Sequence, residues 1–407
     1  MTTGLINVAF GSNTRLAYLI QDEAGVIDTT PEWKVLPFSS AEPNVEAEQM
    51  QDPSMTGDRN MLQPRSGVVN GQITASGKFR PEALDDLLEA AMQGTWGNKY
   101  EVSGLTVEVV DDDGTFSFVL AEGEWEDYGV EVGDSVAFSG FTGDHTDNNT
   151  TVNVTALSPG GEMETDAIGL SAVAEANDIA MESDMGDNFL KVGSTRRAIA
   201  WEIYHADADE YVRIIDTELS QFSIQLQSNG DVTFSLTAIG GSELDLGEDI
   251  DDPVAGATYV TTDAPFYDSF NGYVELDGNP AIYFSELSPS LDNQSSPLFA
   301  IGNRYPIAVA HQKMNAEMSM TAYYQDETIK QKYQSEDVVK LKLQIKYEDV
   351  ADTNTDYHVF TYPSAKITNF GRPVAGEGEL MDNVTILPFK HDGLGSSVLI
   401  QKHNPTS

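Results

Sequence analysis

Residues that could carry out chemistry are few and scattered along this chain. The sequence has no His-x-x-x-His or His-Glu-x-x-His pair for a metal, no P-loop, no Gly-x-Ser-x-Gly turn and no Gly-x-Gly-x-x-Gly turn after a strand. We interpret each histidine as a surface or packing residue. The histidines are His145, His205, His311, His358, His391 and His403. The sequence therefore predicts no catalytic residue, no metal ligand and no cofactor.

Two clusters of carboxylates are the remaining candidates for chemistry. Asp111, Asp112 and Asp113 precede Gly114 and carry the oxygen ligands that calcium prefers, but their spacing is not that of an EF-hand loop. A solvated hairpin turn is the favoured interpretation. The cluster at 207–210 is interpreted in the same way. No carboxylate pair of a glycoside hydrolase can be located from the sequence.

Uncharged polar side chains mark one face of several predicted strands. Residues 72–79 alternate strictly between polar and small or apolar side chains, which is the pattern of a half-buried strand. Such strands suit a sheet whose second face lines a water-filled channel, although a sandwich with a solvated outer face stays open as an alternative. The candidate lumen-facing residues are Gln72, Thr74, Ser76, Gln221, Ser223, Gln225, Thr233, Ser235, Thr237, Glu317, Ser319 and Thr321.

A helix is expected to follow the strand at 72–79. Pro81 suits its first turn, Leu84, Leu87 and Leu88 share one face, and Gly94 closes it, while Asp85, Asp86 and Glu89 are expected to face away. Burial of each leucine is worth roughly 1.5–3 kcal/mol, so we expect the helix to pack on a sheet.

The same strand and helix recur after a shift of 245 positions. An alternating strand at 317–323 runs into a second short helix, in which Ile329 and Tyr333 take the packing positions. The strands and hairpin that follow also recur, at 197–238 and 339–389. Because the order of elements is preserved, we interpret the two segments as an internal repeat.

The repeat divides the chain into parts. We expect a first domain at 1–97 plus 193–245, a small β domain inserted at 98–192, an acidic linker at 246–257 and a second domain with a C-terminal arm at 258–407. Residues 39–66 show no clear periodicity and are expected to form a long docking loop, with Asp58, Arg59 and Arg65 as contact candidates. Lys340, Lys342 and Lys346 are expected on an exposed edge or outer strand.

Composition limits the class of protein. The chain has 407 residues, no cysteine and a formal charge of -44, which disfavours binding to a phosphate backbone. A general adaptation for solubility and a surface that repels an anion both explain the charge. The sequence lacks a signal peptide and any apolar run of membrane-spanning length, so we expect a cytoplasmic origin or release by lysis and no membrane partner.

Several segments resemble the tail tube proteins of long, non-contractile-tailed bacteriophages. They are GSNTRLAYLIQDEAGVIDTTPEWKVLPF at 11–38, GDRN at 57–60, VVNGQITASGKF at 68–79, LDDLLEAAMQGTW at 84–96, the insert at 129–157, MSMTAYYQDETIKQKY at 318–333 and YHVFTYPSAKITNFG at 357–371. The resemblance covers nearly the whole chain. It implies a mainly β fold in which two tandem β-sandwich domains, each with one flanking helix, contribute strands to an inter-subunit β-barrel.

The resemblance also implies a function. It predicts a structural protein of the virion tail, assembled in the host cytoplasm into stacked rings that form the conduit for DNA ejection. Its partners would be itself, the tape measure protein and tail-end proteins, with genomic DNA passing through the lumen without specific binding. From the repeat we expect three chains per ring with pseudo-sixfold symmetry, or alternatively six chains. A monomeric adhesin-like binding protein and a carbohydrate-acting enzyme are the rival hypotheses.

Overall fold

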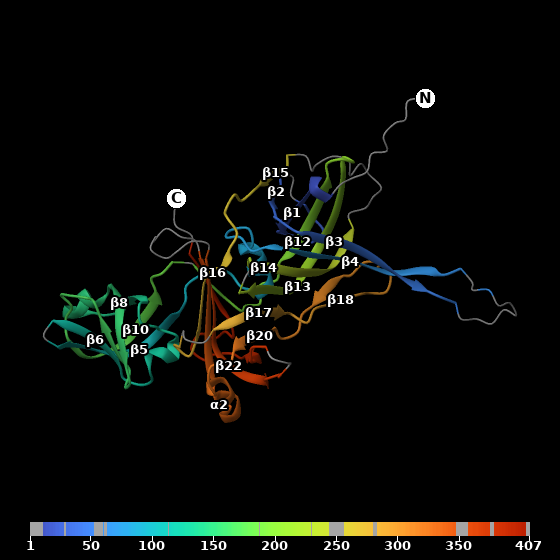
Figure 1. Cartoon of the computed structure of the whole chain (residues 1–407). Coiled ribbons are helices and arrows are strands. Elements are labelled where there is room, and N and C mark those ends of the chain that lie inside the picture. Colours follow the sequence, from blue (N-terminus) through green and yellow to red (C-terminus); the bar gives the residue numbers. More distant parts are fainter. Residues whose placement is uncertain are drawn as a thin grey trace.

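Alternating side chains place most of this chain in β-strands, in agreement with the predicted mainly β class (Figure 1). In the computed structural model the described residues are 11–27, 30–52, 60, 63–112, 114–186, 188–228, 230–243, 256–279, 283–346, 357–374 and 378–403. The acidic linker predicted at 246–257 and the contact candidates Asp58 and Arg59 lie largely or wholly outside these residues.

The first half of the chain, which we define as β1–β4, α1 and β11–β14, forms one curled sheet. Its main strands are hydrogen-bonded in the order β1-β12-β13-β14-β4-β3. Its elements are η1 Gly11–Asn13, β1 Thr14–Gln21, β2 Glu32–Val35, β3 Ser40–Met50, β4 Arg65–Lys78, α1 Asp85–Met92, β11 Phe189–Lys191, β12 Ala198–His205, β13 Glu210–Gln227 and β14 Thr233–Glu243.

The second half, which we define as β15–β24 and α2, repeats this sheet. Its main strands follow the order β16-β21-β22-β23-β20-β17, so β3 corresponds to β17 and β13 to β22. Its elements are β15 Thr258–Val260, β16 Asp268–Leu276, β17 Phe284–Asp292, β18 Ser296–Leu298, β19 Ala308–Ala310, β20 Asn315–Tyr323, α2 Thr328–Ser335, β21 Val339–Lys346, β22 Tyr357–Gly371, β23 Met381–Pro388 and β24 Leu399–His403.

Irregularities in the strand pairing recur at corresponding places in both halves. The β13–β14 ladder shifts register between Leu219 and Gln221, and the β22–β23 ladder shifts between Ile367 and Asn369. The β12–β13 ladder also shifts once, between Ile199 and Trp201, and the β21–β22 ladder shifts once, between Val339 and Leu341. Bulges are specific features of a strand pair. The internal repeat predicted from the sequence is therefore confirmed at the level of strand order and register.

Six further strands between α1 and β11 close into a small barrel. Its strand order is β10-β5-β6-β9-β8-β7, and it has a separate core around Phe118, Trp125 and Phe138. Alternating residues at 105–110, 115–120, 135–139 and 151–157 predict four of these strands, whereas nothing in the sequence predicts β9 and β10. The elements are β5 Glu101–Asp112, β6 Thr115–Leu120, η2 Trp125–Tyr128, β7 Ser135–Ser139, η3 Gly143–Asn148, β8 Thr151–Ser158, β9 Glu162–Thr165 and β10 Val173–Ser183.

Helix α1 begins later than the sequence predicts. Residues 81–84 form a turn, and Glu82 takes a positive φ of 64°, which a helix does not accommodate. Leu84, Leu87 and Leu88 are at most 1% exposed and belong to one core that contains side chains of both halves. The helix therefore packs where the two halves meet, as part of a shared core.

Two other expectations are wrong. Residues 40–50 are not a loop but the strand β3, which pairs with β4 as a long hairpin that extends from the body on the side away from the barrel (Figure 1). The lysine-bearing strand β21 is not an edge, because β16 pairs with one side of it and β22 with the other.

Candidate functional site

One broad polar sheet face runs across both halves. Its strands are hydrogen-bonded in the order β3-β4-β14-β13-β17-β20-β23, and all twelve predicted lumen-facing residues lie on them. Successive Cα partners form polar rows across the strands. One row is Ser40, Ser76, Ser235, Ser223, Ser290 and Glu317, and another is Thr74, Thr237, Gln221, Asp292 and Asn315.

The opposite face of these strands forms the core. Ile73, Phe222, Leu236 and Met318 are at most 2% exposed, whereas the polar residues that alternate with them are half-buried or exposed. Two hollows lie on the polar face at corresponding places, one beside Ser76, Ser223 and Ser235 and the other beside Ser319, Thr321 and Asn383. The polar face is therefore water-accessible and carries a hollow in each half.

The two halves are joined on this face by the antiparallel pair β13–β17. Phe222 is opposite Leu291, Leu226 is opposite Leu287, and these four side chains are 2–6% exposed. On the polar side, the Gln225 side-chain amide donates to Glu286 Oε1 at 2.9 Å. The pair thus makes one continuous sheet from two repeated units.

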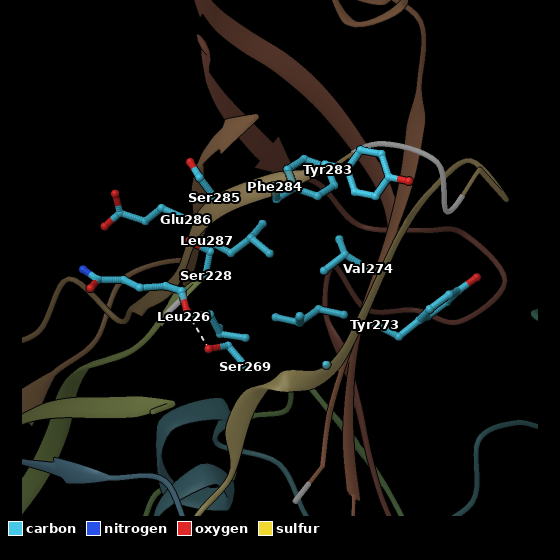
Figure 2. A pocket seen from close by; sticks show the side chains of 13 residues that line it. Leu226, Ser228, Ser269, Tyr273, Val274, Tyr283, Phe284, Ser285, Glu286 and Leu287 are labelled. Carbon is cyan, nitrogen blue, oxygen red and sulfur yellow. Dashed lines mark hydrogen bonds between the residues drawn. The ribbon is translucent and has the colours of Figure 1, made fainter. Parts of the chain in front are cut away.

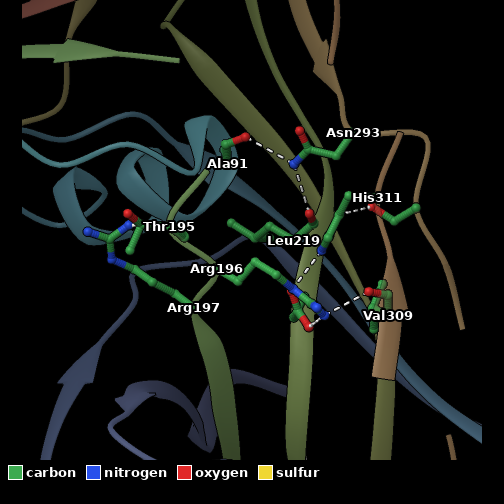
Figure 3. A network of polar contacts seen from close by, with 10 residues as sticks. Ala91, Thr195, Arg196, Arg197, Leu219, Asn293, Val309 and His311 are labelled. Atoms are coloured by element: carbon green, nitrogen blue, oxygen red, sulfur yellow. Dashed lines mark hydrogen bonds and ion pairs between the residues drawn. The ribbon is translucent and has the colours of Figure 1, made fainter. Parts of the chain in front are cut away.

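A buried asparagine fixes the joint to helix α1. The Asn293 side chain is 5% exposed, and its Nδ2 donates to the carbonyl oxygens of Ala91 and Leu219, both at 3.0 Å (Figure 3). One amide therefore satisfies a carbonyl at the end of α1 and another on β13, from a position just after β17.

A charged cluster holds the β18–β19 hairpin on the first half (Figure 3). The Glu218 carboxylate contacts Arg196 and lies 2.7 Å from His311 Nε2, while Arg196 donates to the Val309 carbonyl at 2.7 Å. Burial alone would raise the pKa of Glu218, but the hydrogen bonds from His311 and Arg196 lower it below its usual value. Glu218 is therefore anionic at neutral pH and binds the second half to the first.

Asp85 was expected to face away from the core and does not. It is 7% exposed, with its carboxylate 3.2 Å from His358 Nε2 and 2.7 Å from the Lys402 ammonium. Burial alone would raise the pKa of Asp85, but His358 and Lys402 lower it to about 2. The Tyr267 hydroxyl lies 2.8 Å from His358 Nδ1, so three distant segments of the chain converge on one buried carboxylate.

A hollow of about 230 Å³ opens beside the joint (Figure 2). Side chains of β13, β16 and β17 converge on it, including Leu226, Val274 and Leu287, with Tyr283 65% exposed at its margin. Glu286 is the one carboxylate among the lining residues. A glycoside hydrolase needs two carboxylates at its site, and this hollow does not supply them.

The barrel contacts the second half through the predicted lysine strand. Glu131 of the barrel pairs with Lys340 on β21, and Lys342 lies 3.9 Å away. Burial alone would raise the pKa of Glu131, but Lys99 and Lys340 lower it to about 2. Two of the three predicted lysines, Lys340 and Lys342, thus form a docking surface for the barrel within the chain.

The remaining predicted residues are distributed as follows. Arg65 opens β4 opposite Met50 and is exposed on the β3–β4 hairpin. Ile329 is 5% exposed, whereas Tyr333 is 39% exposed and stacks on Phe370 with ring centroids 6.0 Å apart. Sequence reasoning missed Asn293 and Glu218, since nothing local marks them as joint residues.

Comparison with known proteins agrees with this architecture. The family model described as phage tail tube protein matches residues 11–386, nearly the whole chain. No curated protein matches the chain. No helix within the described ranges is long and apolar enough to cross a membrane. With a matching family model over both halves and the barrel, this chain belongs to the phage tail tube protein family.

Proposed function

We propose that this protein polymerises into stacked rings that form the tube of a phage tail, the conduit through which DNA is ejected. The observation that carries the proposal is the polar face, which continues without interruption from the first half to the second. A sheet that is apolar on one face and polar on the other suits the wall of a water-filled channel.

Closure of the ring follows from the edges of this sheet. An isolated curved sheet leaves two strand edges with unpaired backbone groups, and closure into a barrel removes them. Each chain supplies two copies of the repeated sheet, so three chains would place six copies around the axis. A ring of three chains with pseudo-sixfold symmetry is therefore our proposal, and a ring of six chains is the alternative.

Stacking of rings requires a second, heterologous contact. A head-to-tail contact does not close on itself and so generates a filament. We assign this contact to residues 39–66, with Asp58, Arg59 and Arg65 as its contact residues. Replacing Arg59 and Arg65 with glutamate should leave the chain folded but weaken tube growth, and unchanged growth would contradict this role.

The lumen is expected to pass DNA without binding it. Glu317 is the one ionisable residue among the twelve candidate lumen residues. Further carboxylates of the polar face lie on the neighbouring strands, Glu286 and Asp292 on β17 and Glu42 and Glu46 on β3. A weakly acidic, hydroxyl-rich wall repels phosphate over a screening length of about 8 Å in physiological salt. No catalysis and no cofactor are needed for this role.

The remaining parts fit the same scheme. We assign residues 1–97 plus 193–245 and 258–407 to the two tube domains, and 98–192 to a domain that decorates the outside of the tube in the virion. Its contact with Lys340 on β21, a strand outside the polar face, supports this position. Tape measure and tail-end proteins are the further partners proposed.

Negative-stain microscopy of the purified protein tests the proposal. Rings or tubes with a central channel are the expected result. Dispersed particles in conditions that favour assembly would contradict it and favour a monomeric binding protein or a carbohydrate-acting enzyme, which glycan binding and hydrolysis assays would then separate.

A further inference from the structure

We propose that β3 of one chain pairs with the C-terminal end of β22 of the next chain, in the register that β17 adopts on β13. This inference rests on the proposed function, since it assigns the contact that closes the ring. The partner of β3 is a second copy of this chain. The proposed contact has the same geometry as the β13–β17 pair, which joins the two halves within one chain.

The equivalence of β3 with β17, and of β13 with β22, determines which residues would face each other between chains. Pro43 on β3 faces Ile73 on β4, and Pro289 on β17 faces Met318 on β20, so the two prolines are equivalent. The shared bulges make Gln221 on β13 equivalent to Asn369 on β22. Both strands of the joint therefore have an equivalent elsewhere in the chain.

Among the described residues of the chain, β3 and the C-terminal end of β22 do not pair with each other, whereas their equivalents β17 and β13 do. In the part of the chain that the structure describes, β3 pairs with β4 alone, and residues 366–371 of β22 pair with β23 alone. The equivalent edges of β17 and β13 are hydrogen-bonded to each other. One free edge thus remains at each end of the extended sheet β3-β4-β14-β13-β17-β20-β23-β22.

Exposure of side chains differs as expected for a missing partner. Leu226 in the joint is 5% exposed, whereas Val374, at the equivalent place beyond β22, is 76% exposed. Phe222 is buried and its equivalent Phe370 is only half-buried. Burial of such apolar side chains against a second chain stabilises an assembly.

The register follows from the joint. Phe222 faces Leu291, and Ser223 faces Ser290, within the chain. The equivalent pairs between chains are then Phe370 with Val45 and Gly371 with Asn44, written with the residue of β22 first.

The polar side of the joint has the same chemistry in both places. Within the chain, the Gln221 amide donates to Asp292 Oδ2 at 3.4 Å. Between chains the equivalent pair is Asn369 with Glu46, again an amide opposite a carboxylate. The match of side chains at this row supports the register independently of the apolar row.

Disulfide trapping tests the register, because the chain has no cysteine of its own. Cross-strand Cα atoms are about 4.5–5.5 Å apart, within the span of a disulfide. Gly371 has no positive φ, and a Cβ there would meet nothing within 4 Å. The test variant is Asn44→Cys with Gly371→Cys, and Glu46→Cys with Asn369→Cys is the second pair.

Two matched controls accompany these variants. Ser223→Cys with Ser290→Cys should form a disulfide within one chain, without assembly. Glu42→Cys with Gly371→Cys keeps the same sheet face but shifts the register by two residues, about 7 Å, beyond the reach of a disulfide.

The expected result is that oxidised tubes of both test variants shift on a non-reducing gel to closed rings of three chains, while the shifted control stays monomeric. Tubes without this crosslink, or with a stronger crosslink in the shifted control, would overturn the register and leave the proposed function standing. Folded wild-type monomers that never assemble would overturn both. A test variant that fails to fold is replaced by the second pair, whose outcome decides.

Discussion

Two equivalent phenylalanines allow the intrachain joint and the proposed interchain contact to be perturbed separately. Phe222 lies in the joint, is 2% exposed and stacks on Phe234 with ring centroids 6.5 Å apart. Phe370 occupies the equivalent place on β22 and is half-buried against Tyr333. Replacing each with alanine removes the same atoms from two different environments.

The magnitudes follow from burial. Truncation of a fully buried phenylalanine costs about 3–5 kcal/mol, so Phe222→Ala should lower the free energy of unfolding of the unassembled chain by that amount. Phe370→Ala should cost roughly half as much in the chain, because part of its surface is already in water. The Phe370→Ala variant should also lose about 1–2 kcal/mol of association free energy for each chain added to a ring. This loss raises the critical concentration for assembly roughly 5–30-fold.

Guanidinium unfolding of the unassembled protein measures the first quantity, and sedimentation of tubes against total protein concentration measures the second. The reasoning would be refuted by a Phe370→Ala variant that assembles at the wild-type critical concentration. An equal loss of folding stability in the two variants would refute it as well.

Three further predictions concern stability and assembly. Leu88 is 0% exposed, so Leu88→Ala should lower the free energy of unfolding, measured in guanidinium, by about 2–5 kcal/mol. Tyr333 is 39% exposed, so Tyr333→Ala should lower it much less. Equal losses would contradict the assigned packing. Glu131→Gln should loosen the barrel from β21, measured as faster hydrogen exchange around Lys340. The pKa of Glu131 in the folded protein lies near 2, below its usual value of 4.5. The contribution of Glu131 to barrel docking is therefore complete above about pH 4.5 and is lost as the pH falls toward 2. Docking of the wild-type barrel that strengthens as the pH falls would contradict the prediction. Raising the salt concentration from 0.1 to 1 M should lower the critical concentration for assembly, because screening shortens from about 10 to about 3 Å around chains of charge -44; tubes that dissolve in salt would indicate that ion pairs dominate the contacts.

Much of the fold could be predicted because the information is local. Alternating side chains located the end of β4, the strand β20 and the polar face, and the apolar spacing of Leu84, Leu87 and Leu88 located α1. The repeat was recognisable because both halves keep the same order of elements, although few residues are identical.

The missed features depend on partners that are distant in sequence. Asp85 was assigned to the solvent because its partner His358 lies 273 positions away. Strand β3 escaped prediction although Ala41, Pro43, Val45 and Ala47 alternate with polar residues, because these apolar side chains are small or proline and no residue of β3 is buried. Strand β10 was missed because repeated register shifts against β5 interrupt its periodicity.

The joint could have been found in part from the sequence. Pro43 and Pro289 lie 246 positions apart, close to the shift of the repeat, and this spacing indicates that β3 and β17 are equivalent. The pairing of β17 with β13 could not be foreseen, because two segments that pair across a domain boundary carry no shared local signal.

Cross-sections of purified tubes in cryo-electron microscopy, averaged without imposed symmetry, test the central idea most directly. The account predicts a ring of three chains whose inner wall shows six similar sheets, alternately from the first and the second half, with three outer barrels. Six equivalent chains in one ring, or a channel lined by surfaces other than the polar face, would contradict it.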